Sequence, residues 1–387
     1  MNRKDLKISI ITVCLNSIDT LEQTIQSVVS QDYPNIEYII VDGGSTDGTL
    51  DVIHKYETDI SRWISEPDAG IYDAMNKGIT MATGDYIAFL NSDDWYTEGA
   101  LSYVADDIMK FGASVSSYNM NVYSGNDRIE WEDVFSRDIK NIRIAMCRCH
   151  QAIFAKRSLF EAYGGFDTKY KISADYDWLL RLYDHGVDIR YKSYAVVNFR
   201  LGGLSDSRDI QMRKEAKAIA ILALDQLRKE KKMDEAEYDA VYDKIIRFYE
   251  KSKTDSAMKR LMDHSLALKD ADIHKKLKEL LGENTYTIFG SGGFGIECFR
   301  LLRQLGFRVG CFWDNDPKKW GTSCEGIDIK PPYEIVKGTS KIIVSTEKYF
   351  DEISKQLADV GLEAATDYID YNEIRRKIGD ILEMDQE

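Results

Sequence analysis

The N-terminal part of the chain alternates between short apolar runs and stretches with helical periodicity, and this alternation is the feature that most restricts the fold. The apolar runs are ISIITV (8–13), IEYIIV (36–41) and DYIAFL (85–90), and residues 18–31 carry apolar side chains at helical spacing. Short runs that are mostly apolar in this way are typical of strands buried on both faces. With short links between them, these segments predict an α/β fold in which helices cover both faces of a mostly parallel sheet.

The rest of the chain changes character twice. With 387 residues it is too long for one ordinary domain. After a mixed region up to about residue 200, residues 208–282 are rich in Lys, Glu, Ala and Leu and lack Pro, which indicates helices whose charged residues face solvent. Strand–helix alternation resumes near residue 284. We therefore predict a domain at 1–207, a helical connecting segment at 208–283 and a small α/β domain at 284–387.

The net charge and the cysteines narrow the class of protein. A net charge of −14 disfavours nucleic acid as a partner. The six Cys include no CxxC pair, which suits free thiols in a reducing compartment. No run approaches the ~20 apolar residues that span a bilayer, and the N-terminus has no signal core. We expect a cytoplasmic protein, with peripheral association at the inner face of the cell membrane if it acts on a lipid.

Polar side chains gather where the predicted strands end. Ligands of open α/β sheets bind beyond the carboxyl ends of the strands, and carboxylates there suit a ribose or a hard cation. The alternative without a ligand is that DGGSTDGT is only a Gly-rich turn and NSDD only a solvent-exposed turn. The residues concerned are Thr12 and Asn16 around the first run, Asp42 after the second, and Asn91, Ser92, Asp93 and Asp94 after the third.

Several motifs, in this order and spacing, give the chain a specific resemblance. They are ISIITVCLNS, VDGGSTDGT, EPDAGIYDAMNKG, TGDYIAFLNSDDWY, CHQAIF, GGFD and ADYDWLLRL. Over roughly residues 7–205 the chain resembles glycosyltransferase family 2, in particular the bacterial O-antigen and capsule polysaccharide transferases. The resemblance implies the GT-A nucleotide-diphospho-sugar transferase fold. It also implies transfer of a sugar from a nucleotide-sugar donor to a glycan or lipid-linked oligosaccharide acceptor.

The same resemblance implies residue roles on the donor side. Asp42 corresponds to the carboxylate that contacts the nucleobase, usually uracil, and Thr12 and Asn16 belong to the segment lining that pocket. Asp68 and Asn76 match the segment near the base and the diphosphate. NSDD corresponds to the DxD signature, with Asn91 in place of the first Asp. The implied cofactor is Mn²⁺ or Mg²⁺ on Asp93, with Asn91 and Ser92 beside the donor, and His150 is a further candidate metal ligand.

The acceptor hydroxyl needs a general base as it attacks the anomeric carbon. The resemblance gives this role to Asp175 of ADYDW. Asp177 lies two residues on, about 200° around a helix, and points elsewhere. The complete expectation is a metal-dependent, inverting glycosyltransferase that uses a UDP-sugar.

The C-terminal domain contains a second motif. GSGGFG (290–295) follows a predicted strand and opens a helix, and Asp314 ends the next strand. This context is typical of dinucleotide binding, in which Gly290, Gly292, Gly295 and Asp314 would contact a nucleotide. The domain also resembles small Rossmann-like modules appended to sugar-modifying enzymes. A nucleotide-sugar oxidoreductase or epimerase centred here is the alternative enzyme, and an oligomerisation or scaffold role is the non-catalytic one.

Overall fold

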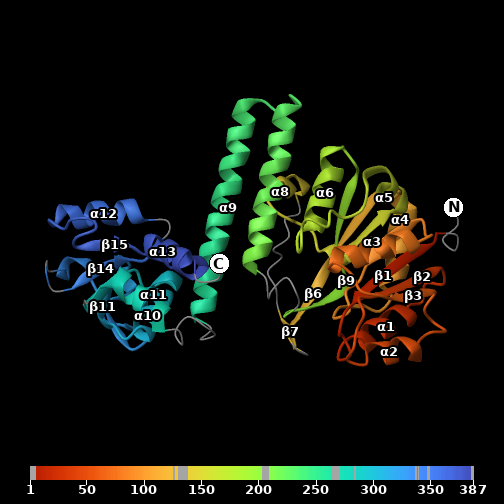
Figure 1. The fold of residues 1–387 in the computed structure, drawn as a ribbon. Helices are drawn as coiled ribbons and strands as arrows, with labels where there is room; N and C mark the ends of the chain where they lie inside the picture. Colours follow the sequence, from red (N-terminus) through yellow and green to blue (C-terminus); the bar gives the residue numbers. More distant parts are fainter. Residues whose placement is uncertain are drawn as a thin grey trace. The chain divides into compact units, whose positions relative to one another are not determined.

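The computed structural model describes residues 6–124, 127–129, 138–202, 209–262, 271–282, 285–335, 338, 340–346 and 349–384. The chain divides into two compact units, 1–248 and 249–387 (Figure 1). This division falls within the predicted connecting segment 208–283, with residues 208–248 in the first unit and residues 249–283 in the second. The predicted boundaries at 207–208 and 283–284 fall on or beside residues outside the described ranges.

The first unit is an α/β unit built on a sheet with strand order β3-β2-β1-β4-β8-β6-β9-β5, and β7 pairs with β6. Its strands are β1 (Ile8–Cys14), β2 (Ile36–Asp42), β3 (Arg62–Ser65), β4 (Tyr86–Phe89), β5 (Trp95–Tyr96), β6 (Val115–Ser124), β7 (Asp127–Ile129), β8 (Ile153–Lys156) and β9 (Ile189–Arg200). The four strands β3, β2, β1 and β4 are parallel, and β8 joins them antiparallel. The predicted α/β fold is confirmed.

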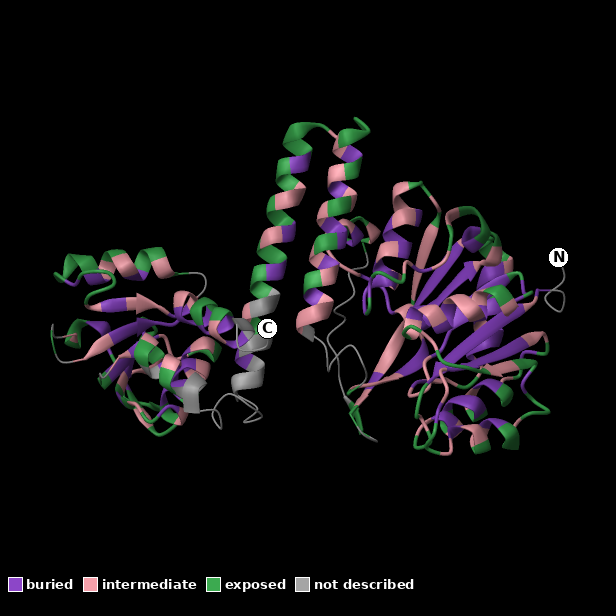
Figure 2. Cartoon of the chain, viewed as in Figure 1, coloured by how far each residue is buried: buried purple, intermediate pink, exposed green. Residues whose placement is uncertain are grey.

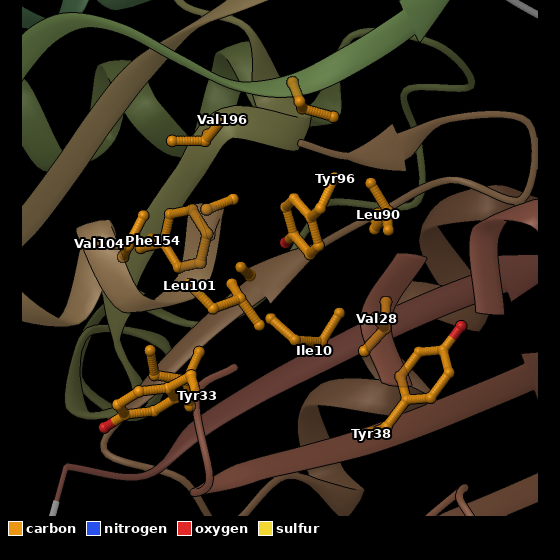
Figure 3. Packing of buried hydrophobic residues seen from close by; sticks show 14 of the residues in the cluster. Ile10, Val28, Tyr33, Tyr38, Leu90, Tyr96, Leu101, Val104, Phe154 and Val196 are labelled. Atoms are coloured by element: carbon orange, nitrogen blue, oxygen red, sulfur yellow. The ribbon is translucent and has the colours of Figure 1, made fainter. Parts of the chain in front are cut away.

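Helices lie on both faces of this sheet. They are α1 (Leu21–Val29), α2 (Thr49–Lys55), α3 (Ile71–Met81), α4 (Ala100–Phe111), α5 (Arg157–Tyr163) and α6 (Ala174–Asp184), with 3₁₀ turns η2 (Ile139–Arg143) and η3 (His150–Ala152). The helix α8 (Asp209–Lys229) contacts α6, and the long α9 (Glu235–Met262) crosses the division between the two units at 248–249. On one face Ile10 packs with Val28 of α1 and Leu101 of α4 (Figure 3). On the other, a Cβ on Gly78 of α3 would lie 2.4 Å from Ile11. Only glycine therefore allows α3 to approach β1 so closely.

The second unit is a smaller α/β unit. Its sheet has the order β12-β13-β11-β10-β14-β15 and is parallel apart from the β12–β13 pair. The elements are α10 (Ala271–Leu281), β10 (Thr285–Phe289), α11 (Gly293–Gln304), β11 (Arg308–Trp313), η4 (Pro317–Lys319), β12 (Ser323–Cys324), β13 (Ile327–Lys330), η5 (Pro332–Glu334), β14 (Lys341–Val344), α12 (Phe350–Asp359), β15 (Tyr368–Asp370) and α13 (Tyr371–Met384).

Burial follows the apolar runs. The strands β1, β2, β4 and β8 are almost continuously buried, whereas β3 and much of β9 are partly exposed (Figure 2). Ile8, Ile10 and Ile11 are fully buried, as predicted for a strand covered on both faces. Within the described residues, none of the helices combines the length and the apolar character needed to cross a membrane.

Candidate active site

The ends of three parallel strands meet at one edge of the first sheet. The pairing register places Cys14 of β1 beside Asp42 of β2, and Asp42 beside Ser65 of β3. The loops that follow β1, β2 and β3 therefore begin side by side at this edge of the sheet. This is the edge at which the sequence predicts a ligand.

Asp42 stands at the centre of this edge, but its own chain uses both carboxylate oxygens. Oδ2 accepts hydrogen bonds from Ser65 Oγ at 2.6 Å and from the backbone N–H groups of Gly44 and Ser45 at 3.0 Å, and Oδ1 accepts one from Ser45 Oγ. The residue is fully buried. Burial acts to raise the pKa of Asp42, yet the hydrogen bonds from Ser45 and Ser65 outweigh it and hold the pKa below its usual value. With its oxygens engaged in this way, Asp42 holds the turn after β2, and its contact with a nucleobase stays a prediction.

Asp42→Ala should therefore lower the free energy of unfolding by about 1–3 kcal/mol, because several buried donors lose their acceptor. The measurement is urea denaturation. Since the folded pKa lies below the unfolded one, the stabilisation is present at neutral pH and disappears as the pH falls through the folded pKa. The difference between variant and wild type should accordingly shrink in acid. Unchanged stability with weakened donor binding would instead favour the direct contact.

The loop after β1 is tied to both neighbouring loops. Asn16 adopts a left-handed conformation with φ 50°, its N–H donates to Ser45 Oγ at 2.7 Å, and its Oδ1 accepts from Thr46 N at 2.9 Å. Ser17 Oγ lies 2.9 Å from Ser92 Oγ, which joins this loop to the NSDD segment. Thr12, by contrast, is fully buried and accepts a hydrogen bond from the Tyr38 hydroxyl at 3.2 Å. Thr12 supports the site from within the core.

Asp68 approaches the turn after β2 from the other side. A Cβ on Gly43 would lie only 2.5 Å from Asp68 Oδ2, so the absence of a side chain at Gly43 makes room for this carboxylate. Oδ1 accepts from Gly70 N at 2.8 Å. Among the described residues no hydrogen bond to Oδ2 is recorded. Asp68 therefore brings a carboxylate oxygen with spare accepting capacity to the edge where Asp42 has little.

The NSDD segment after β4 contains buried oxygen atoms that the chain does not satisfy. Within the described residues, Asn91 Oδ1 and Asp94 Oδ2 have no hydrogen-bond partner. Asp94 is fully buried, and its Oδ1 accepts from Arg200 N at 2.9 Å. Burial raises the pKa of both Asp93 and Asp94, and the neighbouring Asp93 charge adds to the rise for Asp94. A bound cation would offset both the burial cost and the mutual repulsion of these two adjacent carboxylates.

This segment fits a divalent cation of the kind implied by the family resemblance. Among the described residues no group of three or more His, Cys, Asp or Glu could enclose an ion. Mg²⁺ and similar ions are commonly bound by one or two carboxylates together with substrate phosphates and water. Asp93 is half-buried and, unlike Asp94, uses no carboxylate oxygen in a bond to Arg200. Asp93 is thus the residue best suited to hold such an ion.

Asp175 lies at the start of α6 and differs sharply from Asp177. Its Oδ1 is 2.8 Å from the hydroxyl of Tyr72. Asp177 pairs with Arg181, with Oδ2 at 3.0 Å from Nε, which agrees with the expectation that it points elsewhere. Burial raises the pKa of the Cys149 thiol to about 12, with further contributions from the Asp94 and Asp175 charges. Asp94 and Asp175 therefore lie within electrostatic reach of one segment, 149–151.

Two of the predicted site residues, Asn76 and His150, contact neighbouring parts of their own chain. Asn76 uses both ends of its amide on the Phe166 backbone, donating to the carbonyl oxygen at 2.8 Å and accepting from the N–H at 2.9 Å. It joins α3 to the GGFD segment. His150 stacks on Phe89, with ring centroids 5.5 Å apart, and burial lowers its pKa. Its Nε2 has no hydrogen-bond partner among the described residues.

Three residues that hold the site in place were not predicted from the sequence. Tyr72 is part of the EPDAGIYDAMNKG motif, so the motif pointed to the segment but not to the hydroxyl. Ser17 follows Asn16 in the first motif. Glu215 of α8 accepts from the backbone N–H groups of residues 171–173, at 2.9 Å from Ile172 N. Its segment was expected to expose its charges, and no local pattern distinguishes this glutamate.

The glycine turn of the second unit is braced by its own acidic residue. Gly290 has φ 106°, and a Cβ on Gly295 would lie 2.0 Å from Gly290 O, so these two positions require glycine; Gly292 has open space around its Cα. Asp314 Oδ2 accepts from Ser291 N at 3.0 Å and from Lys319 Nζ at 2.9 Å, and Oδ1 accepts from Asp316 N at 2.9 Å. Burial opposes its ionisation, but these bonds keep the pKa of Asp314 below its usual value. The carboxylate that would bind a ribose in a dinucleotide site is thus engaged by its own chain.

Comparison with known proteins agrees with this fold. Residues 9–164 match the sequence model of glycosyl transferase family 2. The PGL/p-HBAD biosynthesis glycosyltransferase of Mycobacterium tuberculosis is 33% identical over 205 residues, which cover 51% of this chain and 79% of that protein. The putative teichuronic acid biosynthesis glycosyltransferase TuaG of Bacillus subtilis is 38% identical over 112 residues, 28% of this chain and 44% of TuaG.

Solved structures show the same fold at lower sequence identity. Residues 1–349 of S. aureus TarS superpose with a TM-score of 0.52 at 18% identity, covering 71% of this chain and 79% of that one. The TarS complex with UDP-GlcNAc gives a TM-score of 0.51 at 16% identity, with 78% and 89% covered. The fold and the strand-end site define a glycosyltransferase of the GT-A type. The chain belongs to glycosyltransferase family 2.

Proposed function

We propose that the protein is a metal-dependent, inverting glycosyltransferase. It transfers a sugar from a nucleotide sugar, a UDP-sugar first of all, to a hydroxyl of a glycan or lipid-linked acceptor in surface polysaccharide biosynthesis of the O-antigen or capsule kind. The observation that carries the proposal is the NSDD segment at the strand edge, where the buried oxygens Asn91 Oδ1 and Asp94 Oδ2 have no partner among the described residues. Asp175 supplies a separate carboxylate. Its charge and that of Asp94 both act on the Cys149 thiol, so both carboxylates lie near residues 149–151.

The residues divide the work by position. Asp68, Asn16 and the Asp42 turn form the nucleoside end of the site, and Asn91, Ser92 and Asp93 form the diphosphate end. Mn²⁺ or Mg²⁺ bound at Asp93 supplies positive charge that offsets the charge of the departing diphosphate. His150 stacks on Phe89, and we place the metal on Asp93 without it.

The transfer is a single displacement at the anomeric carbon. The acceptor oxygen forms a bond to this carbon while the bond from the carbon to the phosphate oxygen breaks, and the electron pair leaves with the nucleoside diphosphate. The acceptor proton passes to Asp175 as the bond forms. Attack from the face opposite the leaving group inverts the configuration. Asp177 takes no part because Arg181 holds it.

The names of the relatives support parts of this proposal. TuaG is named for teichuronic acid biosynthesis, which agrees with a polysaccharide product. TarS has been crystallised with UDP and with UDP-GlcNAc, although its likeness to this chain shows the fold alone. We further propose that the protein works at the cytoplasmic face of the membrane. We also propose three domains, 1–207, 208–283 and 284–387, of which the last has an oligomerisation or scaffold role. The support for this role is that Asp314, the carboxylate that would bind a ribose, is hydrogen-bonded by its own chain.

A thermal-shift screen tests the proposal. The purified protein is heated with UDP-glucose, UDP-galactose, UDP-GlcNAc, GDP-mannose or NAD, each with Mn²⁺, with Mg²⁺ or with EDTA. A ligand at a hundred times its Kd stabilises by about 2.7 kcal/mol, which raises the Tm of a unit of this size by roughly 5–10 °C. We expect one class of nucleotide sugar to give this shift, and only with metal. Stabilisation by NAD alone would favour the oxidoreductase instead.

A further inference from the structure

The hydroxyl proton of Tyr72 faces two hydrogen-bond acceptors. Its hydroxyl lies 2.6 Å from the carbonyl oxygen of Ile172 and 2.8 Å from Asp175 Oδ1. The side chain is buried, with 6% exposure, and its ring packs against Phe166 at a centroid distance of 5.4 Å. Burial and the neighbouring Asp175 charge raise the pKa of Tyr72 well above its ordinary value. The hydroxyl is therefore a permanent donor.

The other acceptor of this proton is fixed from a distant helix. Glu215 of α8 accepts hydrogen bonds from Ile172 N at 2.9 Å and Ser173 N at 3.1 Å, and Ser173 Oγ donates to Met212 O at 3.3 Å. The segment before α6 is thus held by α8 on one side and by Tyr72 of α3 on the other. Neither the Ile172 carbonyl nor the start of α6 can shift without breaking these bonds. The Tyr72 hydroxyl consequently meets Asp175 at a fixed point.

We propose that Tyr72 is the positioning residue of Asp175. The proposal rests on the proposed function, in which Asp175 is the general base. By binding Oδ1, the phenol holds the carboxylate in one orientation. Oδ2, for which no partner is recorded among the described residues, is left to receive the acceptor proton.

The arrangement serves both protonation states of the carboxylate. While Asp175 is ionised, the phenol proton is shared between Oδ1 and the Ile172 carbonyl. Once Oδ2 has taken the proton of the acceptor hydroxyl, the negative charge on Oδ1 is gone and the phenol proton remains with Ile172 O. No other side chain has to move. A base whose geometry is preserved through proton transfer needs little reorganisation at the moment of reaction.

Tyr72→Phe tests the proposal. The assay is UDP release from UDP-glucose, UDP-galactose and UDP-GlcNAc, with and without p-nitrophenyl glycosides as acceptors. A lost hydrogen bond to a charged group corresponds to about a 10- to 100-fold effect. We expect kcat to fall by that factor while the donor Kd stays unchanged. Tyr176→Phe on α6 is the matched control, because its buried hydroxyl also donates to a backbone carbonyl, Ile142 O at 2.7 Å. It should keep wild-type turnover.

A double-mutant cycle separates positioning from a structural role. If Tyr72 acts through Asp175, Tyr72→Phe should change turnover less than twofold when added to Asp175→Asn. An equal loss in both backgrounds would overturn the positioning role, as would wild-type turnover of Tyr72→Phe alongside a defective Asp175→Asn. Wild-type turnover of Asp175→Asn would overturn the proposed base itself. Donor titration and thermal unfolding of each variant confirm that the comparison is made between folded proteins.

Discussion

Asp175→Asn should lower turnover by ~10²–10⁴-fold, the range that a positioned general base contributes, while donor affinity and metal response stay as in the wild type. The amide has nearly the shape of the carboxylate and can still meet the Tyr72 hydroxyl, so packing at the start of α6 is preserved. It cannot accept the proton of the acceptor hydroxyl. The measurements are kcat from nucleoside diphosphate release and donor Kd from titration.

Asp177→Asn is the control for this prediction. Asp177 lies on the same helix turn and is equally a carboxylate, but it pairs with Arg181, which also donates to Gly165 O at 2.8 Å. The control should lose some stability and keep its turnover. If Asp177→Asn were inactive and Asp175→Asn active, the base would be on the other carboxylate. If both lost donor binding, this helix would belong to the nucleotide pocket.

The sheet edge was predictable because it depends on local composition. The runs at 8–13 and 36–41 are mostly apolar and rich in β-branched residues, which predicts strands buried on both faces, and Asp42 marks the end of the second. The family motifs added the NSDD segment and Asp175. In each case the chain within a few residues carries enough information to place the residue at an end of a strand or helix.

The roles of individual oxygens were not predictable in this way. Asp42 was expected to contact the nucleobase, yet Ser65 of β3, 23 positions later, takes part of its capacity. Asn76 was predicted on the donor side, and its amide binds the backbone of Phe166, 90 positions away. Tyr72 meets Asp175 across 103 positions. Whether a carboxylate or amide is free depends on such distant partners, and no pattern within one segment reveals them.

Asp93→Asn should lower metal-dependent turnover by about 10³-fold or more, because a bound divalent cation offsets several kcal/mol of developing charge in the transition state. The fold should be retained, since the Asp93 backbone carbonyl, which accepts from Arg200 Nε at 3.2 Å, is unchanged by the substitution. The variant should also lose the Mn²⁺-dependent part of the thermal shift with nucleotide sugar. This second measurement reports on metal binding without requiring turnover.

Two further variants decide between ion binding and a general charge effect. Asp19→Asn removes a negative charge from the exposed loop after β1 and should leave both measurements unchanged. Asp94→Asn alters the carboxylate that Arg200 N binds at 2.9 Å, so its main effect should be on stability. If Asp94→Asn and not Asp93→Asn abolishes the metal response, the ion belongs on the more deeply buried carboxylate. Near-wild-type turnover of Asp93→Asn at low Mn²⁺ would show that Asp93 holds no catalytic cation. A site with one charged ligand fewer should bind the ion more weakly, so its defect should be clearest when the ion is scarce.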